Sequence, residues 1–161
     1  MRKLWGTITP LLIASKGVSF YNYTIMIFDA HTHIHFPAYD SDREEVIKRA
    51  QVAGIKMITV GTNLITSKEA IVLAEKYPED IWATVGFHPS HVTLTSSQDV
   101  NIYHDKNELR QPIKENFELD EFKKLAGHSK VVAIGECGLD YYRDKQQETS
   151  DKEEQKKVFL K

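Results

Sequence analysis

The sequence contains a single cysteine, Cys137, so the chain cannot form an internal disulfide bond. It has no apolar run of the roughly 20 residues that a membrane-spanning helix requires. The formal net charge is only −2, so the basic excess that is typical of many nucleic-acid-binding domains is missing. With 161 residues, the chain is long enough for one domain with its own core. We therefore expect a cytoplasmic globular protein that does not enter the membrane.

The first 25 residues differ from the remainder of the chain. Arg2 and Lys3 precede a fairly apolar stretch, residues 4–14, which loosely resembles a signal peptide. Pro10 interrupts this stretch, and Met26 lies directly before the first strand-like segment. We expect residues 1–25 to be an extension outside the domain, with export by a signal-like segment as the weaker alternative. Residues 26–161 would then form the domain.

From residue 25 onward, strand-like and helix-like segments alternate. This order is typical of a parallel sheet with helical crossovers, which defines an α/β fold. No glycine-rich loop follows the first strand, so a dinucleotide-binding fold loses its main support. An open sheet and a closed barrel both remain possible at this point. The expected strands are Ile25–Phe28, Ile55–Val60, Ile81–Val85 and Val131–Ile134.

Helix boundaries are expected from capping patterns and apolar spacing. Residues 91–117 are polar and break the alternation, so we expect an insertion that is either solvated or part of the rim of the site. The expected helices start at Ser41 with Glu44 as its capping partner, at Thr66 with Glu69, at Asp120, and at Ser150 with Glu153; the first three end before Gly54, at Tyr77–Pro78 and at Gly127.

Three polar side chains alternate at the end of the first strand. Asp29, His31 and His33 are spaced two residues apart, so a strand directs all three to one face. Two imidazoles on one face can hold a transition metal, and nearby carboxylates extend the choice to manganese or magnesium. The pattern predicts that His31 and His33 are metal ligands. His35 continues the alternation beyond the strand, and we expect an exposed loop residue there.

A carboxylate between glycines follows the fourth strand. Glu136 comes directly after an apolar strand and Gly135, and burying it would be costly unless it were paired or bound to metal. Cys137 should point to the opposite face and pack. Asp140 and Tyr141 are candidates for supporting the ligands or the substrate, although Asp140 could equally cap a turn.

His88 follows the third strand and precedes Pro89. At the rim of a barrel it could bind a substrate phosphate or orient water. A turn histidine held by Pro89 is an equally good interpretation.

Together these segments resemble the TatD family of metal-dependent deoxyribonucleases, within the amidohydrolase superfamily. The likeness rests on Ile27–His33, on the segment that ends at Pro89, on Val131–Tyr142 and on Gln155–Phe159. It implies the N-terminal half, about four βα units, of a TIM-type (β/α)8 barrel that is truncated at its C-terminus.

The resemblance also implies the chemistry of the site. His31 and His33 would bind one divalent ion, and Glu136 would be the catalytic carboxylate that bridges to a second, with Mg, Mn or Zn as candidates and DNA as substrate. His35 departs from the family, which usually has Asp or Asn there. The later ligands belong to the second half of the barrel, so the 161-residue chain is expected to be an inactive fragment.

Two alternatives stay open. One is a hydrolase of the same fold that acts on a small phosphoester, amide or lactone. The other is a non-enzymatic fragment. We expect no stable protein partner, but self-association of the fragment is possible because a half-barrel leaves sheet edges and apolar surface exposed.

Overall fold

A computed structural model describes residues 26–92, 116–141 and 149–161. The predicted extension, residues 1–25, and most of the predicted insertion, residues 93–115, lie outside the described residues. Four parallel strands form one sheet in the order β1-β2-β3-β4: β1 (Ile27–Thr32), β2 (Ile55–Val60), β3 (Ile81–Val85) and β4 (Val131–Ile134).

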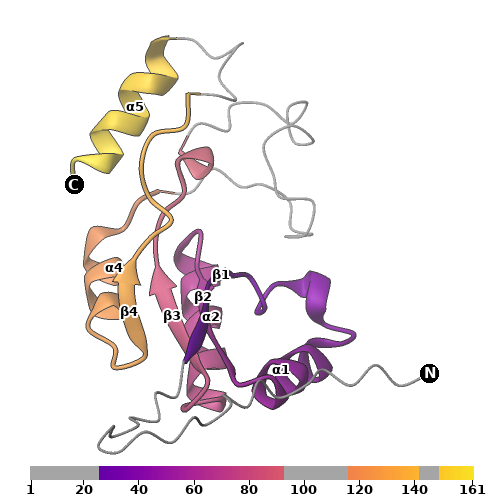
Figure 1. The fold of residues 1–161 in the computed structure, drawn as a ribbon. Helices are drawn as coiled ribbons and strands as arrows, with labels where there is room; N and C mark the ends of the chain where they lie inside the picture. Colours follow the sequence, from indigo (N-terminus) through magenta and orange to yellow (C-terminus); the bar gives the residue numbers. More distant parts are fainter. Residues whose placement is uncertain (1–25, 93–115, 142–148) are drawn as a thin grey trace, which may run out of the picture.

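Within the described residues, four α-helices alternate with these strands (Figure 1). They are α1 (Arg43–Val52), α2 (Leu64–Lys76), α4 (Leu119–Ala126) and α5 (Thr149–Phe159), with short 3-10 turns η1 (Pro37–Tyr39) and η2 (Pro89–His91). Among the described residues, no helix combines the length and apolar character needed to cross a bilayer.

The core lies between the sheet and its helices. Ile81, Ala83 and Val85 alternate on one face of β3 and are fully or almost fully buried with Ala70 of α2 and Phe122 of α4. On the opposite face of the sheet, the Phe28 ring lies 5.5 Å from that of Trp82. Phe28 is still 44% exposed. The helices α1, α2 and α4 therefore cover one face of the sheet, as in one side of a barrel wall.

The first strand differs from the prediction of a buried strand at Ile25–Phe28. It extends to Thr32, and Ile27 is 54% exposed. The reason is its position, because β1 is an edge strand that pairs only with β2 in the described sheet. The other three strands have the predicted bounds.

The capping boxes predicted for α1 and α2 were wrong, for different reasons. α1 begins at Arg43 after Asp42, without a side-chain cap, because the carboxylate of Glu44 accepts hydrogen bonds from Lys76 and Tyr77 instead. α2 begins two residues before Thr66, with Asn63 as its cap. Asn63 Oδ1 accepts from the Thr66 backbone N–H at 2.8 Å, so Thr66 is the partner and not the cap.

Several helix ends follow the prediction. Gly54 has φ of +70° directly after α1, and Gly127 closes α4, which begins one residue earlier than predicted. α5 likewise begins one residue before Ser150.

The outermost residues of the predicted insertion pack in the core: Val92 is buried, and the ring of Phe117 stacks on that of Phe122 at 5.1 Å.

An ion pair ties the start of β2 to the start of β3. Lys56 Nζ lies 2.6 Å from Asp80 Oδ1, and Gln51 Nε2 donates to Asp80 Oδ2 at 2.6 Å. These two donors, lysine first, hold the pKa of Asp80 below its ordinary value of 3.8. The pair lies at the end of the strands opposite to the predicted site residues.

Candidate metal centre

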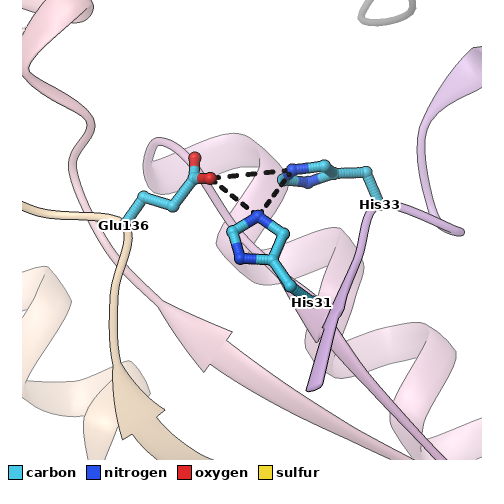
Figure 2. Close-up of side chains that lie close together, drawn as sticks. All are labelled: His31, His33 and Glu136. Atoms are coloured by element: carbon cyan, nitrogen blue, oxygen red, sulfur yellow. Dashed lines mark hydrogen bonds and ion pairs between the residues drawn. The ribbon is translucent and has the colours of Figure 1, made fainter. Parts of the chain in front are cut away.

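Three of the predicted site residues converge at the carboxyl ends of two strands. His31 lies in β1, His33 directly follows β1, and Glu136 follows β4 after Gly135. The strands are parallel, so these ends lie at the same edge of the sheet. Figure 2 shows the two imidazole rings and the carboxylate pointing toward one another. A strand-end position is also where α/β barrels carry their functional groups.

The ligand atoms lie at distances that suit a cation. His31 Nε2 and His33 Nε2 are 3.3 Å apart, and Glu136 Oε1 lies 2.8 Å from the first and 3.8 Å from the second. Ligand atoms at about 2.0–2.1 Å from a tetrahedral ion are themselves about 3.3 Å apart. This group of two imidazoles and one carboxylate therefore fits a transition-metal ion without a large movement of the chain.

The His33 ring is held in place by neighbouring groups. Its Nδ1 lies 2.8 Å from the carbonyl oxygen of Val60, at the end of β2. The ring stacks on Phe36 at a centroid distance of 4.5 Å and an angle of 24°, and the side chain is only 20% exposed. A carbonyl can only accept, so Nδ1 carries the proton and Nε2 presents its lone pair to the site.

His31 is less constrained. Its side chain is 57% exposed, and its Nε2 lies against Glu136. Its backbone N–H donates to Asp29 Oδ1 at 3.3 Å. Asp29 thus accepts a hydrogen bond from the backbone of His31, but its carboxylate is not one of the three grouped ligands.

The position of Glu136 depends on a close approach between the backbone at the end of β3 and the backbone that follows β4. The Thr84 hydroxyl donates to Gly135 O at 2.8 Å, and Gly135 N–H donates to Val85 O at 3.0 Å. A Cβ at Gly86 would lie 2.2 Å from Gly135 O, so only glycine fits there. Sequence reasoning did not identify Thr84 or Gly86 as support for the site; the available signal was their place at the end of β3, beside that of β4.

The structure places the other candidates in different surroundings. His88 is the N-cap of η2, where its Nδ1 accepts from Ser90 N–H at 3.2 Å, which corresponds to the turn interpretation. The backbone N–H of Asp140 donates to Gln155 Oε1 at 2.9 Å. Tyr141 is 39% exposed, and the ammonium of Lys152 lies 5.4 Å from its ring centre. None of these belongs to the three-residue group.

Two expectations near the site were wrong. His35 is buried rather than exposed, because Nδ1 lies 2.6 Å from Thr59 Oγ1 and the ring lies edge-on to Phe36. Cys137 is exposed rather than packed.

Comparisons with known proteins agree with the fold. Residues 28–161 match the family model described as TatD related DNase. A relative from Bacillus subtilis, named "Uncharacterized metal-dependent hydrolase YabD", is 36% identical over 135 residues, which are 83% of this chain and 44% of the relative. The "3'-5' ssDNA/RNA exonuclease TatD" of Erwinia tasmaniensis is 33% identical over 134 residues, 83% of this chain and 43% of that protein.

Two solved structures are also similar. The TatD homologue YjjV of Escherichia coli has a TM-score of 0.51 at 26% identity, over 83% of this chain and 46% of that chain. A TatD-family hydrolase of Entamoeba histolytica has a TM-score of 0.55 at 22% identity, with 83% and 44% coverage, which shows the fold alone. The chain thus spans less than half the length of these relatives. The chain belongs to the TatD-related DNase family, and its parallel sheet corresponds to the N-terminal half of that barrel.

Proposed function

We propose that His31, His33 and Glu136 bind a divalent metal ion and that the protein is a metal-dependent hydrolase of DNA phosphodiester bonds. The observation that carries this proposal is the convergence of two imidazole Nε2 atoms and one carboxylate oxygen within 4.8 Å of one another. Two imidazoles with a carboxylate suit Zn and Mn best, and Mg remains a candidate through Glu136. A bound divalent ion supplies a Lewis acid that neutralises charge on a phosphate oxygen and acidifies water.

The protein residues have separate parts in this proposal. His33 is oriented by Val60 O and presents Nε2, while the more exposed His31 completes the pair. Glu136 is proposed to be the catalytic carboxylate that bridges to a second ion, because it is the one acidic member of the group. Asp29, which accepts from the His31 backbone, is proposed to fix the end of the strand.

Three further residues are proposed to support substrate or ligands rather than to bind metal. His88 follows β3 at the same edge of the sheet and is proposed to contact a substrate phosphate. Asp140 and Tyr141 follow Glu136 along the chain and are proposed to hold its segment against α5, where Asp140 meets Gln155.

DNA is the proposed substrate although the chain is slightly acidic, since metal ions attract phosphates without a basic surface. One relative is named a single-stranded DNA and RNA exonuclease, which supports a nucleic acid over other esters. The second candidate is hydrolysis of a small phosphoester, amide or lactone, favoured by the absence of a basic excess. A cytoplasmic location is proposed for either activity.

Self-association is proposed for the 161-residue chain. In the described sheet, β1 and β4 are edge strands with unpaired outer edges, and Phe28 and Val132 on these strands are 44% and 50% exposed. Unpaired edges with apolar side chains favour pairing with another chain. No stable complex with a different protein is proposed.

The test is a nuclease assay of the purified chain with Mg²⁺, Mn²⁺ or Zn²⁺. Each size-exclusion fraction is incubated with 3'-labelled single-stranded DNA, with the protein in molar excess over the DNA. The Glu136→Gln variant is treated in the same way as the matched control. We expect little or no cleavage by the monomer, as for an inactive fragment, and any cleavage in an assembled fraction should depend on the metal and on Glu136. Cleavage that is equal in Glu136→Gln would contradict the proposal. Metal binding without DNA cleavage in any fraction would favour the small-substrate alternative, which chromogenic phosphate and lactone substrates then check.

A further inference from the structure

The first residue of α1 reaches back over the loop that follows the paired histidines. Arg43 Nε donates to Ile34 O at 2.7 Å, and Nη2 donates to Phe36 O at 2.8 Å and to His35 O at 3.1 Å. Nη2 also lies 2.6 Å from Asp40 Oδ1. One guanidinium thus serves three successive backbone carbonyls and one carboxylate.

The loop that Arg43 holds is buried. Ile34, His35 and Phe36 are 2%, 7% and 1% exposed, so little water reaches this segment. A buried carbonyl without a donor is costly. The Arg43 side chain is itself only 22% exposed, and a buried cation is retained only when such partners surround it. The guanidinium and the loop therefore depend on each other.

Phe36 connects this arrangement to His33. Its carbonyl accepts from Arg43, its backbone N–H donates to His33 O at 2.8 Å, and its ring stacks on the His33 imidazole. The opposite restraint on the imidazole is the contact of Nδ1 with Val60 O. If Phe36 moves, the imidazole loses the flat surface that keeps Nδ1 directed at Val60.

We propose that Arg43 is a positioning residue that fixes the tautomer and direction of the His33 imidazole through Phe36. Arginine suits the task because its planar fork carries five N–H donors, whereas lysine offers one compact ammonium that cannot span the same carbonyls. The consequence for metal affinity rests on the proposed metal-binding function, but the consequence for the His33 tautomer does not need a metal.

The chain offers a matched control on the same helix. Arg49 is 62% exposed and lies 4.0 Å from Glu45, so it shares the charge of Arg43 without any contact to the loop. Arg49→Ala removes an arginine from α1 and leaves the carbonyls of residues 34–36 satisfied. The variants are therefore Arg43→Ala, Arg43→Lys and Arg49→Ala in the 161-residue chain.

The first measurement needs no metal. Long-range ¹H–¹⁵N spectra of the metal-free protein at mildly alkaline pH report which nitrogen of each neutral imidazole carries the proton. We expect the wild type and Arg49→Ala to hold His33 as the Nδ1–H tautomer. Arg43→Ala and Arg43→Lys should show exchange between both tautomers, and methylguanidinium at non-denaturing concentration should restore the single tautomer in Arg43→Ala.

The second measurement is Co²⁺ affinity, followed by the visible spectrum of the ion. Loss of a group that orients a ligand lowers metal affinity by about 10–100-fold, which we expect for Arg43→Ala and not for Arg49→Ala. A single Nδ1–H tautomer in folded Arg43→Lys or Arg43→Ala, with wild-type spectra, would overturn the proposal. If Arg43→Ala does not fold, the His33 tautomer in Arg43→Lys alone decides whether the proposal holds. A wild type that binds no Co²⁺ while His33 still responds to Arg43 would refute the proposed function only.

Discussion

Gly86→Ala is the substitution that tests how the site is built. Gly86 follows β3, and a methyl group on it would lie 2.2 Å from Gly135 O and 2.4 Å from Glu136 N. Both atoms belong to the backbone and cannot rotate away. To reach an ordinary contact of 3.4 Å, the segment that carries Glu136 must move by about 1.2 Å. That shift breaks two hydrogen bonds of Gly135: its N–H donates to Val85 O at 3.0 Å, and its carbonyl oxygen accepts from the Thr84 hydroxyl at 2.8 Å.

The magnitude follows from these losses. Two partly buried hydrogen bonds at about 1 kcal/mol each, with an overpacking cost of about 1–3 kcal/mol, predict a destabilisation of about 3–5 kcal/mol. A carboxylate displaced by about an ångström is also a poorer ligand, and we expect metal affinity to fall by about 10–100-fold. Thermal unfolding measures the first effect, and Co²⁺ titration below the unfolding temperature measures the second.

Gly54→Ala is the control for Gly86→Ala. Gly54 has φ of +70° with open space around it, so alanine there is strained but touches nothing near the site. It should destabilise by about 1–2 kcal/mol and leave Co²⁺ affinity unchanged. The reasoning is refuted if folded Gly86→Ala binds Co²⁺ like the wild type, or if Gly54→Ala loses the ion to the same extent.

The remaining predictions concern the ligands, an ion pair and the N-terminus. Glu136→Ala should lower total metal content more than His31→Ala, because the carboxylate is proposed to bridge two ions; elemental analysis measures both. Asp80→Asn should destabilise by about 1–2 kcal/mol at neutral pH, measured by urea unfolding. The pKa of Asp80 is lowered in the folded state, so the Asp80 carboxylate stabilises the fold fully above pH 3.8 and loses this effect as the pH falls below that value. The free energies of unfolding of wild type and Asp80→Asn should therefore converge in acid. Deletion of residues 1–24 should leave thermal unfolding unchanged.

Each of these predictions has a contrary outcome. Unchanged metal content in Glu136→Ala would exclude the bridging role. If the difference in free energy of unfolding between wild type and Asp80→Asn persists or grows in acid, the ion pair with Lys56 is not the cause of that difference. A large fall in the unfolding temperature on deletion of residues 1–24 would mean that this segment packs on the domain.

The parts of the fold that follow from local sequence pattern were predictable. β2, β3 and β4 have the expected bounds because each is a short apolar run between clear breaks. The meeting of His31 and His33 with Glu136 was also predictable, since parallel strands bring their carboxyl ends to one edge.

Features that depend on distant contacts were not predictable. Glu44 leaves its expected capping role because Lys76 and Tyr77, more than thirty residues away, bind its carboxylate. His35 is buried because Thr59 lies opposite on the next strand. The carbonyls bound by Arg43 are backbone groups, which every sequence carries and no motif marks.

Metal binding by the 161-residue chain tests the central claim most directly. Co²⁺ is titrated into the metal-free wild type and into the double variant His31→Ala/His33→Ala, with stoichiometry read from equilibrium dialysis and ligand type from the visible spectrum. We predict saturable binding with a spectrum of nitrogen and oxygen ligands in the wild type, weaker than in a site with a complete ligand set, and its loss in the variant. Equal binding by both proteins, or none by the folded wild type, would contradict the account.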